Sequence, residues 1–439
     1  MSKNLLVGVD GKARKAKELY IGVDGKARKI AKAYIGDENG KARLFWEKET
    51  TPITDSLEFV SDNSFTMSAT KLWDGTIEYN NGNGWTTWNG SQISSGNIDG
   101  RQRIYFRGSR NTVIRGQNAT ETDSWKITGS NVECNGNIEY LLDYQKVAAG
   151  QHPEMGSRCY REMFTNCSSL ITSPELPAIT LANGCYQSMF RNCSSLTIAP
   201  ELPATTLADY CYHNMFSGCS SLTTAPALPA TTLKPSCYYN MFFGCSKLTT
   251  APELPATNLA KSCYYQMFRN CSSLTTAPQL PATTLAENCY QYMFGNCSSL
   301  TEAPSLPATT LAVSCYREMF YGCEKLIIAP ALPATTLAKN CYYYMFYGCF
   351  RLRKIPALPA HILPDFCYYG MFKECDIYLY SSGDETKNVI YLLPSEKHQW
   401  TNTQKESNSL TNMFTYDGLI QTPNFPAGYR LDNYYSIIS

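Results

Sequence analysis

Between residues 159 and 375 the pattern of apolar and polar positions repeats with a fixed period. In CYYNMFFGCSKLTTAPELPATNLA, residues 237–260, three apolar residues fall at i, i+4 and i+8, with Phe242 beside them. This spacing predicts one apolar stripe along a short helix. We therefore expect a structural core made of Cys237, Met241, Phe242, Cys245 and Leu248.

The Cys-Tyr pair that opens this stretch recurs every 26 residues, and a second cysteine follows eight positions later each time. A fixed period of this length predicts a solenoid, in which each unit buries its apolar face by stacking on its neighbours. Nine units account for all but one of the 19 cysteines. Their first cysteines are Cys159, Cys185, Cys211, Cys237, Cys263, Cys289, Cys315, Cys341 and Cys367.

The residue before the second cysteine is Gly or Asn in every unit except the last. Both residue types tolerate a left-handed backbone, so this position predicts a positive-φ helix cap. The caps expected from the middle units are Gly218, Gly244, Asn270, Asn296, Gly322 and Gly348. Glu374 breaks the rule in the ninth unit, where we expect the array to fray or to be capped.

A short strand is expected after each cap, over about residues 246–251 of the unit quoted above. Prolines such as Pro252 and Pro255 then turn the chain, because a proline cannot donate to a central ladder. Strands stack about 4.8 Å apart, whereas helices need about 8–10 Å. This difference predicts a curved solenoid with a concave strand face.

The flanking segments have different patterns. Residues 1–50 contain three related phrases with turn dipeptides at Asp10-Gly11, Asp24-Gly25 and Asn39-Gly40, which predict small β-hairpins. Residues 51–150 alternate polar and apolar positions with frequent turns, which predicts a β-sandwich-like domain. Its tryptophans could form a carbohydrate platform, although core packing is the commoner fate. Residues 376–439 are expected to cap the solenoid, since TNMFTYDGL at 411–419 echoes the repeat.

The order Phe242, Cys245, Leu248, Leu254-Pro255, Leu259 resembles the BspA-like, or Treponema-type, leucine-rich repeats. The resemblance covers residues 153–375 and departs from the family in its longer period and in the first Cys-Tyr of each unit. It implies recognition or adhesion through a solenoid surface, without catalysis. The tandem IGVDGKAR-type phrases of residues 1–46 resemble N-terminal segments of structural proteins from phages and prophages of gut bacteria.

Composition narrows the function classes. The 38 basic and 37 acidic residues nearly cancel, so the overall charge does not favour a nucleic-acid partner. The chain has no apolar run of about 18 residues, which argues against membrane insertion. The N-terminus does not look like a secretory signal peptide. A cytosolic origin makes disulfides unlikely to form during folding, and we expect two ladders of buried free thiols.

The cysteines do not predict a metal site. Structural zinc sites use short spacings such as C-x2-C, whereas eight positions along a helix separate two sulfurs by about 12 Å. Neighbouring helices would also lie too far apart for a disulfide. No cofactor is expected.

Catalytic residues are equally hard to find. His152, His213, His361 and His398 are far apart in sequence, and Glu175, Glu201 and Glu253 are replaced by other residue types in most units. A hydrolase would need a carboxylate pair at a fixed separation, and nothing singles one out.

The positions that vary between units are the candidate binding residues. The two residues after each Cys-Tyr are rich in Tyr, Arg and Asn, which suits a binding surface, although neutral drift of solvent-facing residues would produce variation too. The candidates are Tyr239, Asn240, Tyr265, Gln266, Tyr292, Arg317, Tyr343 and Tyr344. A rival surface is the concave strand face, around Thr249, Thr275, Glu302, Ile327 and Lys354.

Together these patterns predict an α+β multidomain chain. Residues 1–50 are an assembly segment, 51–150 a β-sandwich-like domain, 151–375 a curved leucine-rich-repeat solenoid of nine units, and 376–439 a cap. The favoured function is non-enzymatic: a phage or prophage tail protein of the virion that binds a host cell-surface glycan or protein. Residues 1–50 would contact other virion proteins, and a homo-oligomer is left open. The alternatives are a BspA-like adhesin on the bacterial surface and, less favoured, a tailspike glycan hydrolase.

Overall fold

The computed structural model describes the backbone of strands within residues 6–47, then residues 53–115, 120–352, 356–360 and 362–375, and a few positions beyond. The chain divides into two compact units, Met1–Thr54 and Asp55–Ser439. Each unit is described by itself below. Among the described residues, no helix combines the length and the apolar character needed to cross a membrane.

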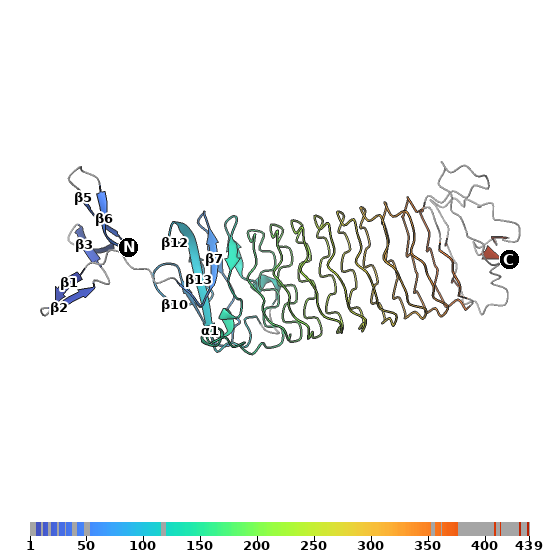
Figure 1. The fold of residues 1–439 in the computed structure, drawn as a ribbon, viewed down its shortest axis with the longest axis horizontal. Helices are drawn as coiled ribbons and strands as arrows, with labels where there is room; N and C mark the ends of the chain where they lie inside the picture. Colours follow the sequence, from blue (N-terminus) through green and yellow to red (C-terminus); the bar gives the residue numbers. More distant parts are fainter. Residues whose placement is uncertain are drawn as a thin grey trace. The chain divides into compact units, whose positions relative to one another are not determined.

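The described strands of the first unit form three antiparallel hairpins (Figure 1). β1 (Leu6–Val9) pairs with β2 (Lys12–Lys15), and β3 (Leu19–Val23) pairs with β4 (Lys26–Ile30). β5 (Lys32–Gly36) pairs with β6 (Ala42–Glu47), with a register shift between Ala33 and Tyr34. The chain therefore forms hairpins around the three turn dipeptides that predicted them.

The second unit begins with two antiparallel sheets. The larger sheet has the order β10-β9-β13-β7-β15, with β12 also paired to β13, and the smaller has the order β11-β8-β14. The strands are β7 (Leu57–Ser61), β8 (Thr66–Ser68), β9 (Thr76–Asn80), β10 (Thr86–Thr87), β11 (Ile93–Ser94), β12 (Gly96–Ile98), β13 (Arg101–Ser109), β14 (Lys126–Thr128) and β15 (Glu133–Asn135). A 3-10 turn, η1 (Glu121–Asp123), precedes β14, and helix α1 (Tyr140–Ala148) packs against β13.

The tryptophans of this region pack mainly in the core. Trp73 and Trp88 stack with ring centroids 5.3 Å apart, and Trp125 lies 5.0 Å from Trp88 in an edge-to-face arrangement. All three are buried. Trp85 is half-buried and stacks on the Arg107 guanidinium at 4.1 Å. A four-tryptophan carbohydrate platform is therefore not formed.

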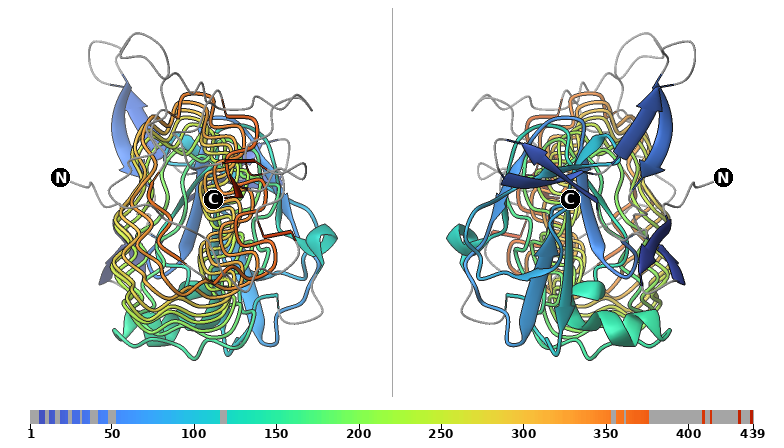
Figure 2. Two further views of the ribbon diagram at one scale, coloured as in Figure 1. Left: turned by 90° about the vertical axis from the view of Figure 1, so that its right-hand side faces the viewer. Right: turned by 90° about the vertical axis from the view of Figure 1, so that its left-hand side faces the viewer.

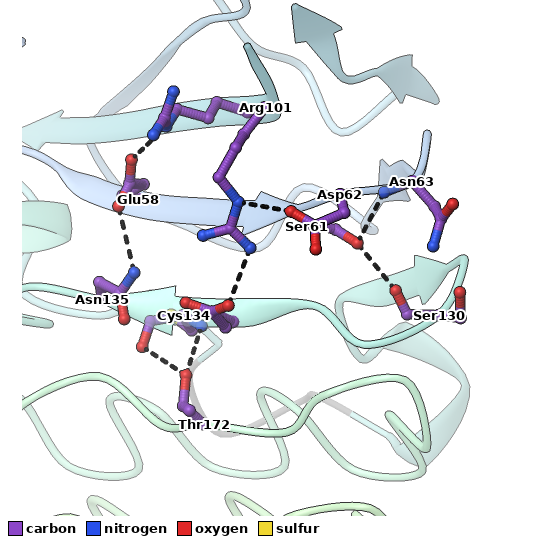
Figure 3. Close-up of polar contacts among 11 residues, drawn as sticks. Glu58, Ser61, Asp62, Asn63, Arg101, Ser130, Cys134, Asn135 and Thr172 are labelled. Atoms are coloured by element: carbon purple, nitrogen blue, oxygen red, sulfur yellow. Dashed lines mark hydrogen bonds and ion pairs between the residues drawn. The ribbon is translucent and has the colours of Figure 1, made fainter. Parts of the chain in front are cut away.

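A polar network crosses the larger sheet and reaches the first repeat (Figure 3). Arg101 donates to Asp62 at 2.8 Å and to Glu133 at 2.9 Å, so two of the carboxylates here are held by an arginine. On β15, the Cys134 amide donates to Thr172 Oγ1 at 3.0 Å. The sheet edge is thus hydrogen-bonded directly to the repeat region.

The backbone of the sheet region also forms hydrogen bonds with the first unit of the repeat. The amides of Ile114 and Arg115 both donate to the Cys159 carbonyl at 3.0 Å, and the Trp125 amide donates to Met163 at 2.9 Å. Further along, Val132 donates to Ser169 and Ile138 to Glu175. The sheets therefore act as the preceding layer of the stack, and both regions share one hydrophobic core.

From residue 159 the chain winds into stacked coils that lie side by side (Figure 1) and superimpose when viewed along the stack (Figure 2). The expected helix in each unit is wrong over the described residues. In the unit at 237, the amides of Tyr239, Met241 and Phe243 each donate to the carbonyl three residues earlier, whereas those of Tyr238, Asn240 and Phe242 donate to the next coil at 2.9–3.0 Å. We call this segment, from the first to the second cysteine, the turn segment.

Positive φ recurs at every fourth residue of the turn segment and explains why a helix does not form. In this unit Ser236, Asn240 and Gly244 have φ of 52°, 52° and 71°. A positive φ at the third residue is what a type II turn requires, and it directs alternate amides outward. A period of four, unlike the 3.6 of a helix, keeps Cys237, Met241 and Cys245 in line, and all three are fully buried.

The predicted cap residues do have positive φ, but they lie within the turn segment and end no helix. Gly218, Gly244, Asn270, Asn296, Gly322 and Gly348 all have φ between 59° and 77°. Glu374 also has a positive φ, 55°, so the backbone conformation continues through the ninth unit although the residue type changes.

The expected strand over 246–251 reduces to single parallel bridges. Thr224 bridges Thr250, and Thr250 bridges Thr276; a second row includes the bridge from Thr232 to Asn258. Because backbone hydrogen bonds between adjacent coils occur here and along the turn segments, the unequal spacing from which we predicted curvature is absent. The argument for a bend therefore no longer applies.

Ladders of identical side chains run along the stack. Tyr212 and Tyr238 stack at 5.8 Å, Phe216 and Phe242 at 5.7 Å, and the same contacts continue from unit to unit. The thiol of Cys245 donates to the Phe216 carbonyl of the preceding coil at 3.1 Å, and the equivalent bond recurs for the other second cysteines. All 19 cysteines are free and buried, as predicted. The argument that neighbouring units lie too far apart for a disulfide was wrong, however. Adjacent coils are hydrogen-bonded and lie closer than packed helices.

The stack continues beyond the ninth unit. The amide of Tyr368 donates to Ser409 at 3.0 Å, and that of Phe372 donates to Met413 at 2.9 Å. Ser409 and Met413, both buried, thus take the places of a first cysteine and its methionine. Met413, from the echo of the repeat noted at 411–419, thus covers the ninth coil together with Ser409. The remaining strands, β16 (Arg430–Leu431) and β17 (Ile437–Ile438), pair with each other.

Candidate functional site on the turn face

The side chains two, three and six positions after each first cysteine line one face of the stack, which we call the turn face. They alternate with the buried Cys-Tyr and Met-Phe pairs, so the ladders hold each one at a fixed height along the stack. Most are half-buried. All eight predicted ligand-binding residues lie on this face: Tyr239, Asn240, Tyr265, Gln266, Tyr292, Arg317, Tyr343 and Tyr344.

The first half of the turn face carries a stacked row of rings. His213 and Tyr239 have ring centroids 4.6 Å apart, and Tyr239 and Tyr265 are 4.5 Å apart, each pair within 9° of parallel. These separations are shorter than those of the buried tyrosine ladder. The row therefore presents ring edges and hydroxyl groups at regular intervals along the stack.

The second half combines rings with cations. Tyr343 stacks on Tyr369 at 5.1 Å and lies under the Arg317 guanidinium at 4.5 Å. Tyr321 stacks on Tyr347 at 4.7 Å. Cation–π contacts of this kind hold long side chains in place at a surface.

Arg269 lies between these two groups. Its guanidinium is 4.5 Å from the Tyr292 ring and 5.9 Å from the Phe243 ring. Aromatic and cationic groups are thus present along the face from His213 to Tyr369, over seven successive units.

Several buried polar atoms on this face have no hydrogen-bond partner. They are His213 Nδ1, Asn240 Oδ1, Arg269 Nε and Glu318 Oε2. Buried polar groups are normally satisfied, so each exception requires an explanation such as a bound ligand or ordered water. In the core, each second-cysteine thiol has a carbonyl partner, whereas the hydroxyl groups of Tyr186, Tyr290 and Tyr368 in the buried tyrosine ladder also have none.

Two of these residues have shifted pKa values. Burial raises the pKa of Glu318 to about 7, and the nearby Arg269 charge opposes the rise. Glu318 Oε1 accepts a hydrogen bond from Arg317 Nε at 2.9 Å. Burial also lowers the pKa of His213 to about 4, so this imidazole is neutral at pH 7. The face therefore holds a carboxyl group that titrates near neutrality.

Half of the predicted ligand-binding residues have a positive φ. The sequence did not indicate this backbone conformation. Asn240, Gln266, Tyr292 and Tyr344 have φ between 49° and 57°. Such values are uncommon outside Gly, Asn and Asp, and Gln and Tyr gave no signal of them.

The prediction also missed residues. Arg269, Glu318, Tyr321 and Tyr347 belong to the same surface. Position six varies between units as strongly as positions two and three, so that variation could have identified three of the four.

The rival surface is also present. Thr249, Thr275 and Glu302 are exposed in the rows that contain the parallel bridges, and Ile327 is 37% exposed. Lys354 lies outside the described residues. We call this surface, twelve and thirteen positions after each first cysteine, the threonine face.

The described residues bring together little catalytic or metal-binding chemistry. No group of three or more His, Cys, Asp or Glu suited to a metal occurs among them. His152 contacts Glu139 at 2.8 Å, far along the chain from His213, and His361 and His398 fall outside the described residues. Between residues 237 and 350, Glu318 is the only acidic residue at turn-face positions of the sequence.

The comparisons with known proteins give no family for this chain. No family model matches it, and neither a curated protein nor a solved structure is significantly similar. What the chain shows by itself is an antiparallel sheet region followed by a solenoid-like stack of 26-residue units with aromatic and cysteine ladders.

Proposed function

We propose that this chain is a non-enzymatic recognition protein whose turn face binds a host cell-surface glycan or protein. The observation that carries the proposal is the line of unpartnered polar atoms among stacked Tyr, His and Arg side chains on one face. Aromatic and arginine side chains are enriched where binding energy concentrates. A polar ligand that satisfies these atoms would supply the missing partners.

The setting proposed for this recognition is a phage or prophage tail. The resemblance of residues 1–46 to phage structural segments supports it, and the first unit would then contact other virion proteins. The resemblance of residues 153–375 to BspA-like leucine-rich repeats supports a recognition role. The finer leucine-rich-repeat assignment and a homo-oligomeric state belong to this proposal as well.

A bacterial surface adhesin of the same repeat class is the second candidate, and it rests on the same resemblance. A tailspike hydrolase is less well supported, because the two acidic residues at turn-face positions, Glu162 and Glu318, lie six units apart and cannot flank one scissile bond. Neither nucleic acid nor a membrane is proposed as a partner.

Binding of the fluorescently labelled full chain to a panel of gut bacterial isolates tests the recognition function. We expect saturable binding to some isolates, without release of reducing ends from their surface glycans. Periodate treatment of the cells would abolish binding to a glycan, and protease treatment would abolish binding to a protein. Absence of binding to every isolate, or sugar release on binding, would contradict the proposal.

A further inference from the structure

The Arg269 side chain on the turn face is held between two aromatic rings. Its guanidinium lies 4.5 Å from the Tyr292 ring and 5.9 Å from the Phe243 ring. The next unit has Gly295 at the position equivalent to Arg269, and a Cβ there would lie 2.9 Å from Tyr292 Cδ1. The absence of a side chain at Gly295 therefore leaves room for the Tyr292 ring beside the guanidinium. Cation–π contacts with both rings restrict where the guanidinium can lie.

The nitrogens of Arg269 differ in exposure. Nε is buried and has no hydrogen-bond partner. The two terminal nitrogens also have no hydrogen-bond or ion-pair partner among the described residues, but they are not buried. The residue as a whole is half-buried. The terminal nitrogens thus reach the surface of the turn face with their donors available to a ligand.

The other three arginines at turn-face positions each have a carboxylate partner. The pairs are Arg161 with Glu162, Arg191 with Glu121, and Arg317 with Glu318. Arg269 is close enough for its charge to act on Glu318, but it forms no ion pair with that carboxyl. Within the part of the chain that the structure describes, the turn face therefore has one arginine without a counter-charge of its own.

The chemistry of this surface favours an acidic glycan as the ligand. A guanidinium offers parallel N–H donors that match the two oxygens of a carboxylate. The tyrosine hydroxyl groups that recur along the face can donate to or accept from sugar hydroxyl groups. Protein interfaces usually have an apolar centre, whereas none of the large apolar side chains exposed among the described residues is at a turn-face position.

We propose that Arg269 is the anchor of a binding site for an acidic glycan. Its terminal nitrogens donate to the carboxylate of one sugar residue, and the glycan chain extends along the tyrosines of the turn face. The inference deepens the proposed function and rests on it for the face that binds. It narrows the ligand from a glycan or a protein to a glycan that carries carboxylate groups.

Binding of the full chain to immobilised polygalacturonate, alginate and hyaluronan at physiological ionic strength tests this site. We expect at least one of these carboxylate polymers to bind, and neutral dextran not to bind. Arg269→Gln should weaken the binding about ten-fold or more, because charge-assisted hydrogen bonds are lost. Arg269→Lys keeps the positive charge without the planar fork, and it should weaken binding several-fold.

Arg191→Gln is the matched control, because Arg191 has the same position in another unit and is already paired with Glu121. This variant should keep wild-type affinity, and thermal unfolding should show that the Arg269 variants remain folded. Binding to none of the three polymers, or equal losses for Arg191→Gln and Arg269→Gln, would overturn the inference.

Two further outcomes separate this inference from the proposed function. Arg269-dependent binding to polyglutamate but to none of the acidic glycans would overturn it and indicate an acidic protein as the ligand. Wild-type affinity of Arg269→Gln for a bacterial isolate that binds the native chain would also overturn it, while the proposed recognition function would stand.

Discussion

At the scale of single residues, glycines with the same positive-φ backbone differ in how much room their surroundings leave for a side chain. Gly218 and Gly244 both have φ above 70°. A Cβ on Gly218 would lie 2.2 Å from Asn192 Oδ1, whereas one on Gly244 would find its nearest atom at 3.9 Å. The alternation of Gly and Asn along this row therefore reflects steric fit between neighbouring coils as well as a backbone preference.

Replacing these glycines by alanine should separate the two effects. Both variants pay the cost of a positive φ, about 1 kcal/mol, and Gly218→Ala must also displace Asn192. We expect Gly218→Ala to lower the free energy of unfolding by about 1 kcal/mol more than Gly244→Ala. Urea unfolding of both variants measures this difference, and equal losses would show that the contact with Asn192 costs nothing.

Glu318 should make stability depend on pH. Its pKa is about 7 when folded, above the ordinary value of 4.5, so the folded chain retains this proton where the unfolded chain has lost it. The contribution of the protonated Glu318 to the free energy of unfolding is therefore complete below pH 4.5 and is lost as the pH rises to 7. Relative to Glu318→Gln, the wild type should lose about 1–3 kcal/mol over this interval.

Denaturant unfolding of both proteins at pH 4.5, 6 and 7.5 tests this expectation. Glu302→Gln, on the exposed threonine face, is the matched control and should track the wild type. A constant difference between wild type and Glu318→Gln would show that this carboxyl does not titrate as the structure indicates.

At the scale of elements, the sequence predicted which residues are buried but not the backbone that buries them. The i, i+4, i+8 spacing of Cys237, Met241 and Cys245 fits a helix and a period-four series of turns almost equally well. The distinguishing signal is positive φ at the third residue of alternate turns, and Gln266, Tyr292 and Glu318 conceal it. The sequence predicts a strand over about residues 246–251, between the expected cap and the prolines, yet each coil contributes a single bridge there.

The thiol ladders give a prediction at this scale. Burial raises the pKa of Cys245 and its counterparts well above the usual range, so almost no thiolate is present at pH 8. In the native chain we expect almost no rapid reaction with a thiol reagent. After denaturation without reductant, all 19 thiols should react. A low count in the denatured chain would reveal disulfides and contradict the structure.

At the scale of the whole molecule, the sheets and the stack fall in one compact unit from residue 55 onward. The sequence suggested a boundary near residue 150, because the repeat begins there. Hydrogen bonds from Ile114, Trp125 and Val132 to the first coil cross that boundary, and a sequence pattern cannot register them. The candidate site was nevertheless predicted in large part, since variation among otherwise identical units identified positions two and three.

Truncation tests this unity. A fragment of residues 55–439 should unfold cooperatively at the temperature of the full chain's stack, whereas a fragment of residues 151–439 should be much less stable or insoluble. The second fragment exposes Tyr160 and Phe164, whose neighbours in the sheet region are lost. Equal melting temperatures for the two fragments would show that the sheets are a separate domain.

The central claim is that recognition takes place on the turn face, and a comparison of two double variants tests it most directly. Tyr239→Ser/Tyr265→Ser removes two stacked rings from the turn face, and Thr249→Ala/Thr275→Ala changes the same two units on the threonine face. Affinity for a gut bacterial isolate that binds the wild-type chain is the measurement. The account predicts at least a ten-fold loss for the first variant, from about 1.4 kcal/mol or more, and wild-type affinity for the second. Loss of binding only in the second variant would contradict it.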